Sequence, residues 1–73
     1  MAKFSNIECI TGYGSLEYVT QTKLSTVKEL TEIIRMVDEY KGTVSIFDDY
    51  IFCKFIDYEA SVLFKMTWEL DHE

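Results

Sequence analysis

Residues 26–42 read TVKELTEIIRMVDEYKG and carry the strongest helical pattern in the chain. Thr26 and Glu29 form a T-x-x-E capping box, in which each side chain satisfies a backbone amide at the start of a helix. Apolar residues then recur at three- and four-residue spacing on one side of the helix, and charged residues occupy the other. The apolar positions are Val27, Leu30, Ile33, Ile34, Val37 and Tyr40. Gly42 is expected to end the helix in the left-handed conformation, and Lys41 before it complements the helix dipole.

Strand patterns lie on both sides of this helix. Residues 4–11 and 15–22 come before it and are rich in apolar, β-branched and aromatic side chains. The glycine-containing loop between them suits a hairpin, so the two strands should pair antiparallel. Residues 43–47 and 50–56 come after the helix and have the same strand-like composition, with two aspartates between them. These four segments predict two hairpins.

Residues 61–70 show the most regular alternation in the chain. One parity is apolar throughout and consists of Val62, Phe64, Met66, Trp68 and Leu70. The other parity is mostly polar, so this segment predicts a last strand whose apolar side faces the helix. Residues 57–60 before it are predicted to form a turn.

The element order ββαβββ predicts an α+β fold, with an antiparallel sheet of about five strands and one amphipathic helix packed on one face. Residues 1–73 are expected to form a single domain, because a chain of roughly 60 residues buries only about 60% of its unfolded surface. Residues 50–56 are apolar at both parities, which is more than one core needs when the other side of the sheet is solvated. Either side chains wrap around that uncovered face or another molecule covers it.

The net charge is −6, from thirteen acidic and seven basic residues. This charge repels phosphate backbones, so direct binding of nucleic acid is not expected, whereas a protein with a basic surface is attracted. Residues 43–73 carry seven of the acids and only two of the bases. The acidity is therefore expected on the strands that follow the helix.

The sequence gives no sign of export or of membrane insertion. It starts MAKFSNIE, without an apolar run of signal-peptide length, and no stretch approaches the roughly 20 apolar residues of a membrane span. A cytoplasmic location without a membrane partner is therefore expected. Cys9 and Cys53 both lie in apolar strand patterns, which favours two buried, reduced thiols over a disulfide bond.

Residue types that carry catalysis or bind metals are sparse. His72 is the only histidine and lies beside the C-terminus, where a catalytic base is not expected. Cys9 and Cys53 have apolar neighbours and do not supply a zinc ligand set. The acidic turns lack the ligand spacing of an EF-hand loop. We therefore expect no enzyme activity, no cofactor and no metal; a small hydrolase or metal-dependent enzyme would require these carboxylates to converge in a concave site.

The remaining candidates are surface residues of the C-terminal half. Carboxylates spread over a sheet edge can imitate a phosphate backbone, and exposed aromatic side chains dominate protein interfaces. The candidate partner-binding residues are Asp48, Asp49, Tyr50, Phe52, Asp57, Tyr58, Glu59, Glu69 and Asp71. The alternatives are that the acids only keep an apolar protein soluble and that the aromatics only cap the edges of a small core.

These features favour a small, acidic, non-enzymatic protein-binding module that occupies a basic site on a nucleic-acid-binding partner by charge mimicry. In kind, such a protein resembles the inhibitors that phages and mobile elements direct at host nucleases and defence complexes. The alternative is a homo-oligomeric structural or assembly protein, in which the uncovered sheet face closes by forming a homodimer.

Overall fold

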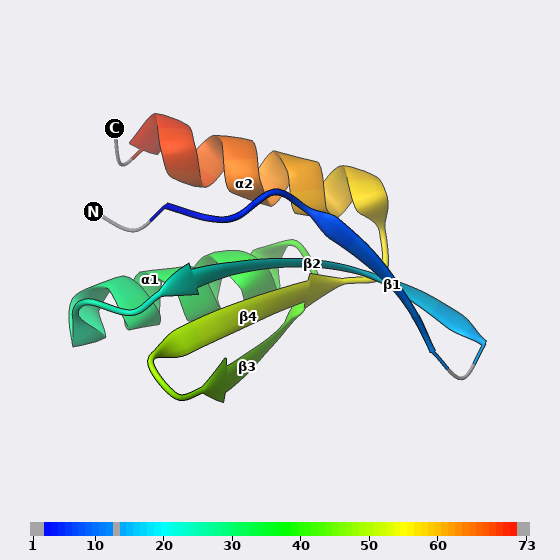
Figure 1. Ribbon diagram of the computed structural model, residues 1–73. Helices are drawn as coiled ribbons and strands as arrows, with labels where there is room; N and C mark the ends of the chain where they lie inside the picture. The colour runs from blue at the N-terminus through cyan, green and yellow to red at the C-terminus, as the bar shows by residue number, and fades with distance from the viewer. Residues whose placement is uncertain (1–2, 13, 72–73) are drawn as a thin grey trace.

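The computed structural model describes residues 3–12 and 14–71, which form one antiparallel four-stranded sheet and two helices (Figure 1). The elements are β1 (Glu8–Gly12), β2 (Ser15–Lys23), α1 (Val27–Glu39), β3 (Thr43–Phe47), β4 (Tyr50–Phe55) and α2 (Tyr58–Asp71). The strands lie in the order β1-β2-β4-β3. The predicted α+β class with an antiparallel sheet is therefore confirmed, whereas the fifth strand and the order ββαβββ are wrong.

The described elements repeat the order ββα twice. Each repeat is a hairpin followed by a helix, and β2 of the first pairs antiparallel with β4 of the second. Tyr18 is opposite Phe55 and Lys23 is opposite Tyr50 in this central pair. The two hairpins therefore lie side by side with β1 and β3 at the outer edges of the sheet.

Residues 61–70 are not a strand because they belong to helix α2. Of the alternating apolar set, Phe64 and Trp68 are buried, whereas Met66 and Leu70 are more than half exposed. A four-residue spacing fits both the strand and the helix period, so the pattern alone was ambiguous. Half of this stretch consists of the good helix formers Leu, Lys, Met and Glu, no glycine or proline interrupts it, and Asp57 accepts a hydrogen bond at its start.

Both helices bury residues against the same face of the sheet, which we call the inner face. Helix α1 contacts β3, and α2 contacts β2 and β4. The buried cluster combines one side of β4 with both helices and the segment before β1. Its members are Phe4, Ile33, Val37, Ile51, Cys53, Phe55, Phe64 and Trp68. Tyr40 and Thr67 also join α1 to α2 through their hydroxyl groups, 3.2 Å apart.

The segment before β1 completes this core. Phe4 packs edge-on against Phe64 and Trp68, with ring centroids 5.1 and 5.6 Å away. The Ser5 amide donates to the Gln21 carbonyl over 2.8 Å, so this segment still lies along β2. The predicted strand over residues 4–11 is therefore regular only from Glu8, because Phe4 turns into the space between sheet and helix.

Helix α1 begins as predicted but ends differently. Thr26 Oγ1 accepts a hydrogen bond from the Glu29 amide at 3.1 Å, while Glu29 Oε2 is buried without a partner, so the capping box is half formed. At the other end Lys41, not Gly42, has positive φ, at 60°. The Gly42 amide donates to Val37 and the Lys41 amide to Asp38, which is a Schellman motif.

Candidate protein-interaction surface

The side of the sheet opposite the helices is the candidate surface, and we call it the outer sheet face. The register places Val19 beside Lys54, Gln21 beside Phe52, and Lys23 beside Tyr50 on this side. The outer sheet face as a whole comprises Glu8, Ile10, Glu17, Val19, Gln21, Lys23, Thr43, Ser45, Phe47, Tyr50, Phe52 and Lys54. Neither α1 nor α2 covers it, because both pack on the inner face.

Aromatic side chains gather at one end of the outer sheet face. Phe47 and Tyr50 are opposite each other on β3 and β4 and are 72% and 43% exposed. Phe52 is the next outward residue of β4 and is half-buried. The alternation of β4 explains this exposure, since Ile51, Cys53 and Phe55 point into the core and the residues between them point outward. An exposed phenylalanine next to a tyrosine is typical of an interaction site.

The outer sheet face has no net charge. It holds two carboxylates, Glu8 and Glu17, and two ammonium groups, Lys23 and Lys54. In a chain of net charge −6, this surface is therefore neutral, and the excess acidity lies elsewhere.

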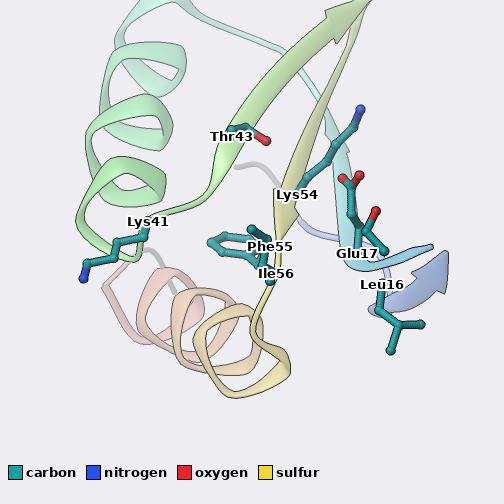
Figure 2. A pocket seen from close by; sticks show the side chains of 8 residues that line it. Leu16, Glu17, Lys41, Thr43, Lys54, Phe55 and Ile56 are labelled. Atoms are coloured by element: carbon teal, nitrogen blue, oxygen red, sulfur yellow. The ribbon is translucent and has the colours of Figure 1, made fainter. Parts of the chain in front are cut away.

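An open pocket of about 580 Å³ lies where the outer sheet face meets the end of the sheet (Figure 2). It exists because β1 and β2 pair as far as Gly12 and Ser15, whereas β4 pairs with β2 only up to Tyr18. The lining residues are Ser15, Leu16, Glu17, Lys41, Thr43, Lys54, Phe55 and Ile56. Ser15 Oγ donates to the Gly12 carbonyl, and Lys41 points away from the pocket. The lining pairs no nucleophile with a general base.

The predicted partner-binding residues do not form one patch. Tyr50 and Phe52 lie on the outer sheet face, and Asp48 and Asp49 form the β3–β4 turn beside it. Asp57, Tyr58 and Glu59 lie at the start of α2, beyond the opposite end of β4, and Glu69 and Asp71 lie at the end of α2. The expectation that the acids lie on strands after the helix is wrong, because Asp48 and Asp49 lie in a turn and the acids from 59 to 71 lie on α2.

Several of these residues have structural partners. Asp57 Oδ1 accepts the Glu59 amide at 3.0 Å and so caps α2. Glu69 lies 4.0 Å from Lys65, one helical turn away. The ring of Tyr58 packs on Tyr18, with centroids 5.2 Å apart. Tyr58 therefore belongs to the inner side of the fold and is separated from Tyr50 and Phe52.

The structure also brings together acids that the sequence did not connect. An open pocket of about 420 Å³ lies between the helices and is lined by Glu32, Arg35, Met36, Glu39, Thr67 and Asp71. Glu32 and Glu39 are seven residues apart, so their common side of α1 could have been predicted. Asp71 could not, because the segment before it was predicted to be a strand.

The two cysteines differ in environment. Both are free thiols; Cys53 is fully buried, and this burial raises its pKa to about 12. Cys9 is exposed, so the prediction of two buried thiols is wrong for this residue. Its pairing with Tyr18 places it on the inner side of β1, which is an edge strand of the sheet. His72 lies outside the described residues.

Within residues 3–12 and 14–71, no three histidine, cysteine or acidic side chains are grouped so that they could hold a metal ion. In the same residues, neither helix is long and apolar enough to cross a membrane. No protein-family model matches the chain, and no curated protein or solved structure is significantly similar to it.

Proposed function

We propose that this protein is a non-enzymatic protein-binding module whose binding surface is the outer sheet face. The supporting observation is the exposed row formed by Phe47 and Tyr50, with Phe52 beside it, on a side of the sheet that no described helix covers. Burying one such side chain contributes roughly 1.5–3 kcal/mol, and hot spots of protein interfaces are built from aromatic side chains. A protein surface of complementary shape fits this exposed aromatic row on a face without net charge.

A second candidate function is charge mimicry by the helix layer. The helices and their flanking residues, 26–41 and 57–71, carry eight acids and four bases. Glu39 and Asp71 line the same open pocket together with Arg35. A partner with a basic surface, such as a nucleic-acid-binding protein, would dock there, and the protein would act as an inhibitor by excluding the nucleic acid.

Capture experiments with tagged protein test the proposal and separate it from the second candidate. Tyr50→Lys places a charge on the outer sheet face, and Leu63→Lys makes a similar change on α2, where Leu63 is 46% exposed compared with 43% for Tyr50. We expect Tyr50→Lys to abolish retention of the partner and Leu63→Lys to leave it intact. Equal retention by both variants and the unchanged protein would refute binding through the outer sheet face.

The second candidate predicts a different result. Raising the salt from about 0.1 M to about 1 M shortens the Debye length from about 10 Å to about 3 Å and should release a partner held by charge. Asp71→Lys should weaken that binding, whereas Tyr50→Lys should not. A partner that is retained in high salt and lost with Tyr50→Lys supports the outer sheet face alone.

A further inference from the structure

We propose that the occupant of the outer sheet face is a second copy of this chain, packed face to face with its strands antiparallel to those of the first. This inference rests on the proposed function, because it names the partner of the same surface. The resulting homodimer has a two-fold axis, so every contact across the interface occurs twice.

Charge favours this surface over the helix layer and over the β3–β4 turn. Each chain carries a net charge of −6, and two helix layers or two Asp48–Asp49 turns would repel each other. The outer sheet face has no net charge, so two copies approach there without the local repulsion of the acidic surfaces. A neutral surface also gives no long-range attraction for a basic partner, which favours a second copy as the occupant.

The positions of the charges are self-complementary. Glu17 and Lys23 both point outward from β2 and are six residues apart, which is about 20 Å along a strand. A two-fold axis that crosses β2 at Thr20 places each end of β2 over the opposite end of β2 in the partner subunit. It therefore places Glu17 over Lys23 of the partner subunit, and the reverse pair forms on the other side of the axis.

The same axis brings an aromatic ring to the second lysine. Lys54 and Phe52 are consecutive outward residues of β4, and they lie beside Val19 and Gln21 of β2, respectively. The axis exchanges these two positions along the strands. Lys54 then lies over the ring of Phe52 of the partner subunit, where a cation–π contact favours association. Across the proposed interface, Lys23 thus contacts an opposite charge and Lys54 contacts a ring.

The area is that of a weak dimer. The four strands contain 25 residues in all, and each residue covers about 16 Å² at the usual rise and strand spacing. The outer sheet face therefore offers on the order of 400 Å², below the roughly 600 Å² per partner of stable specific interfaces and in the range of weak, transient ones. A dimer of this size should dissociate on dilution.

Sedimentation velocity at low salt tests the inference over protein concentrations from about 1 µM to about 1 mM, the range in which such a small interface titrates. The mass should rise from 8.6 kDa toward twice that value. Glu17→Lys and Lys23→Glu should each weaken dimerisation by about tenfold or more, and the double variant should restore it because the pair is re-formed with its charges exchanged.

Matched controls make the same charge changes outside the outer sheet face. Asp38→Lys and Lys28→Glu alter exposed residues of α1 and should leave the dimer unchanged. Circular dichroism shows that each variant is folded. A dimer that is weakened equally by Asp38→Lys, or that the double variant does not restore, overturns the proposed arrangement.

Failure of this inference is distinguishable from failure of the proposed function. A protein that stays at 8.6 kDa throughout the concentration range overturns the second copy as occupant. If that monomer still retains a partner that Tyr50→Lys loses, the outer sheet face binds a different protein. If the monomer retains no partner, or retains one that Tyr50→Lys does not release, the proposed function fails as well.

Discussion

Gly42 lies so close to Lys54 that a Cβ atom on the glycine would meet the Lys54 carbonyl oxygen at 2.7 Å. The same Cβ would also meet the ring of Phe55 at 2.7 Å. This close approach holds the junction between α1 and β3 in place, because the glycine lets the backbone of that junction pack directly against β4. Glycine is required here for space, and the left-handed conformation is taken by Lys41 instead.

Gly42→Ala should therefore destabilise the protein. The added methyl group must displace backbone or a buried ring, which costs about 1–3 kcal/mol. Gly12→Ala is the matched control, since nothing lies within 4 Å of its Cβ position. Chemical denaturation measures both, and equal midpoints for the two variants would contradict the close approach to Lys54.

Lys41→Gly should stabilise the protein. Lys41 has φ of 60°, a conformation that costs a residue with a side chain about 1–2 kcal/mol and glycine almost nothing. The greater freedom of glycine in the unfolded chain offsets part of this, which leaves a gain of about 0.5–1 kcal/mol. Lys28→Gly, inside α1, should instead lose about 1 kcal/mol. Thermal unfolding compares the two, and a loss of stability in both would argue against the Schellman motif.

The stability of the protein should fall in alkaline solution because of Cys53. Burial raises the pKa of this thiol from 9.0 to about 12, so the folded chain keeps a proton that the unfolded chain releases. The contribution of the protonated thiol is complete below pH 9 and decreases as the pH rises toward 12, by at most about 1.4 kcal/mol per pH unit. Urea unfolding at several pH values measures this slope.

Cys53→Ala should flatten that part of the pH profile, and Cys9→Ala should leave it as it is, because Cys9 is exposed. Thiol labelling of the folded protein provides an independent check: a reagent should modify Cys9 at neutral pH and leave Cys53 unmodified until the protein unfolds. Identical profiles for the two alanine variants would show that Cys53 is not the group responsible.

Asp57→Ala should cost about 1 kcal/mol, because Asp57 Oδ1 accepts the Glu59 amide in the first turn of α2. Asp49→Ala removes the same charge from the β3–β4 turn, where the carbonyl rather than the side chain bonds to Leu24, and should change stability by less than about 0.5 kcal/mol. Thermal unfolding of the two variants shows whether the Asp57 side chain stabilises α2. Equal midpoints would leave Asp57 as a surface acid available to a partner.

Local sequence was sufficient for the elements whose signals agree. Helix α1 has both its Thr26 cap and a regular apolar stripe, and the strands at 43–47 and 50–55 are separated by a two-residue turn of aspartates, a residue type common in turns. The outer sheet face was also foreseeable, since Tyr50 and Phe52 lie at the parity that β4 does not bury. The cap, the apolar stripe and the alternation within β4 depend on neighbours no more than four residues apart.

Helix α2 and the distribution of the acids depended on the whole fold. Phe64 and Trp68 satisfy a strand and a helix equally well in isolation, and their burial against Phe4 selects the helix. That choice moves Asp71 next to Glu39 and takes Tyr58 away from Tyr50. The predicted acidic strands were wrong for this reason.

The sequence by itself therefore determined an acidic α+β chain with a capped central helix, two hairpins and more apolar side chains than one side of a sheet can bury. Only the tertiary structure decided that a second helix joins the first on the inner face and that the outer sheet face is neutral. The physical reason is the distance along the sequence over which each interaction acts. Helix caps, chain turns and strand alternation involve residues that are close in sequence. The burial of Phe64 and Trp68, by contrast, requires Phe4, which lies sixty residues before Phe64, to be in place.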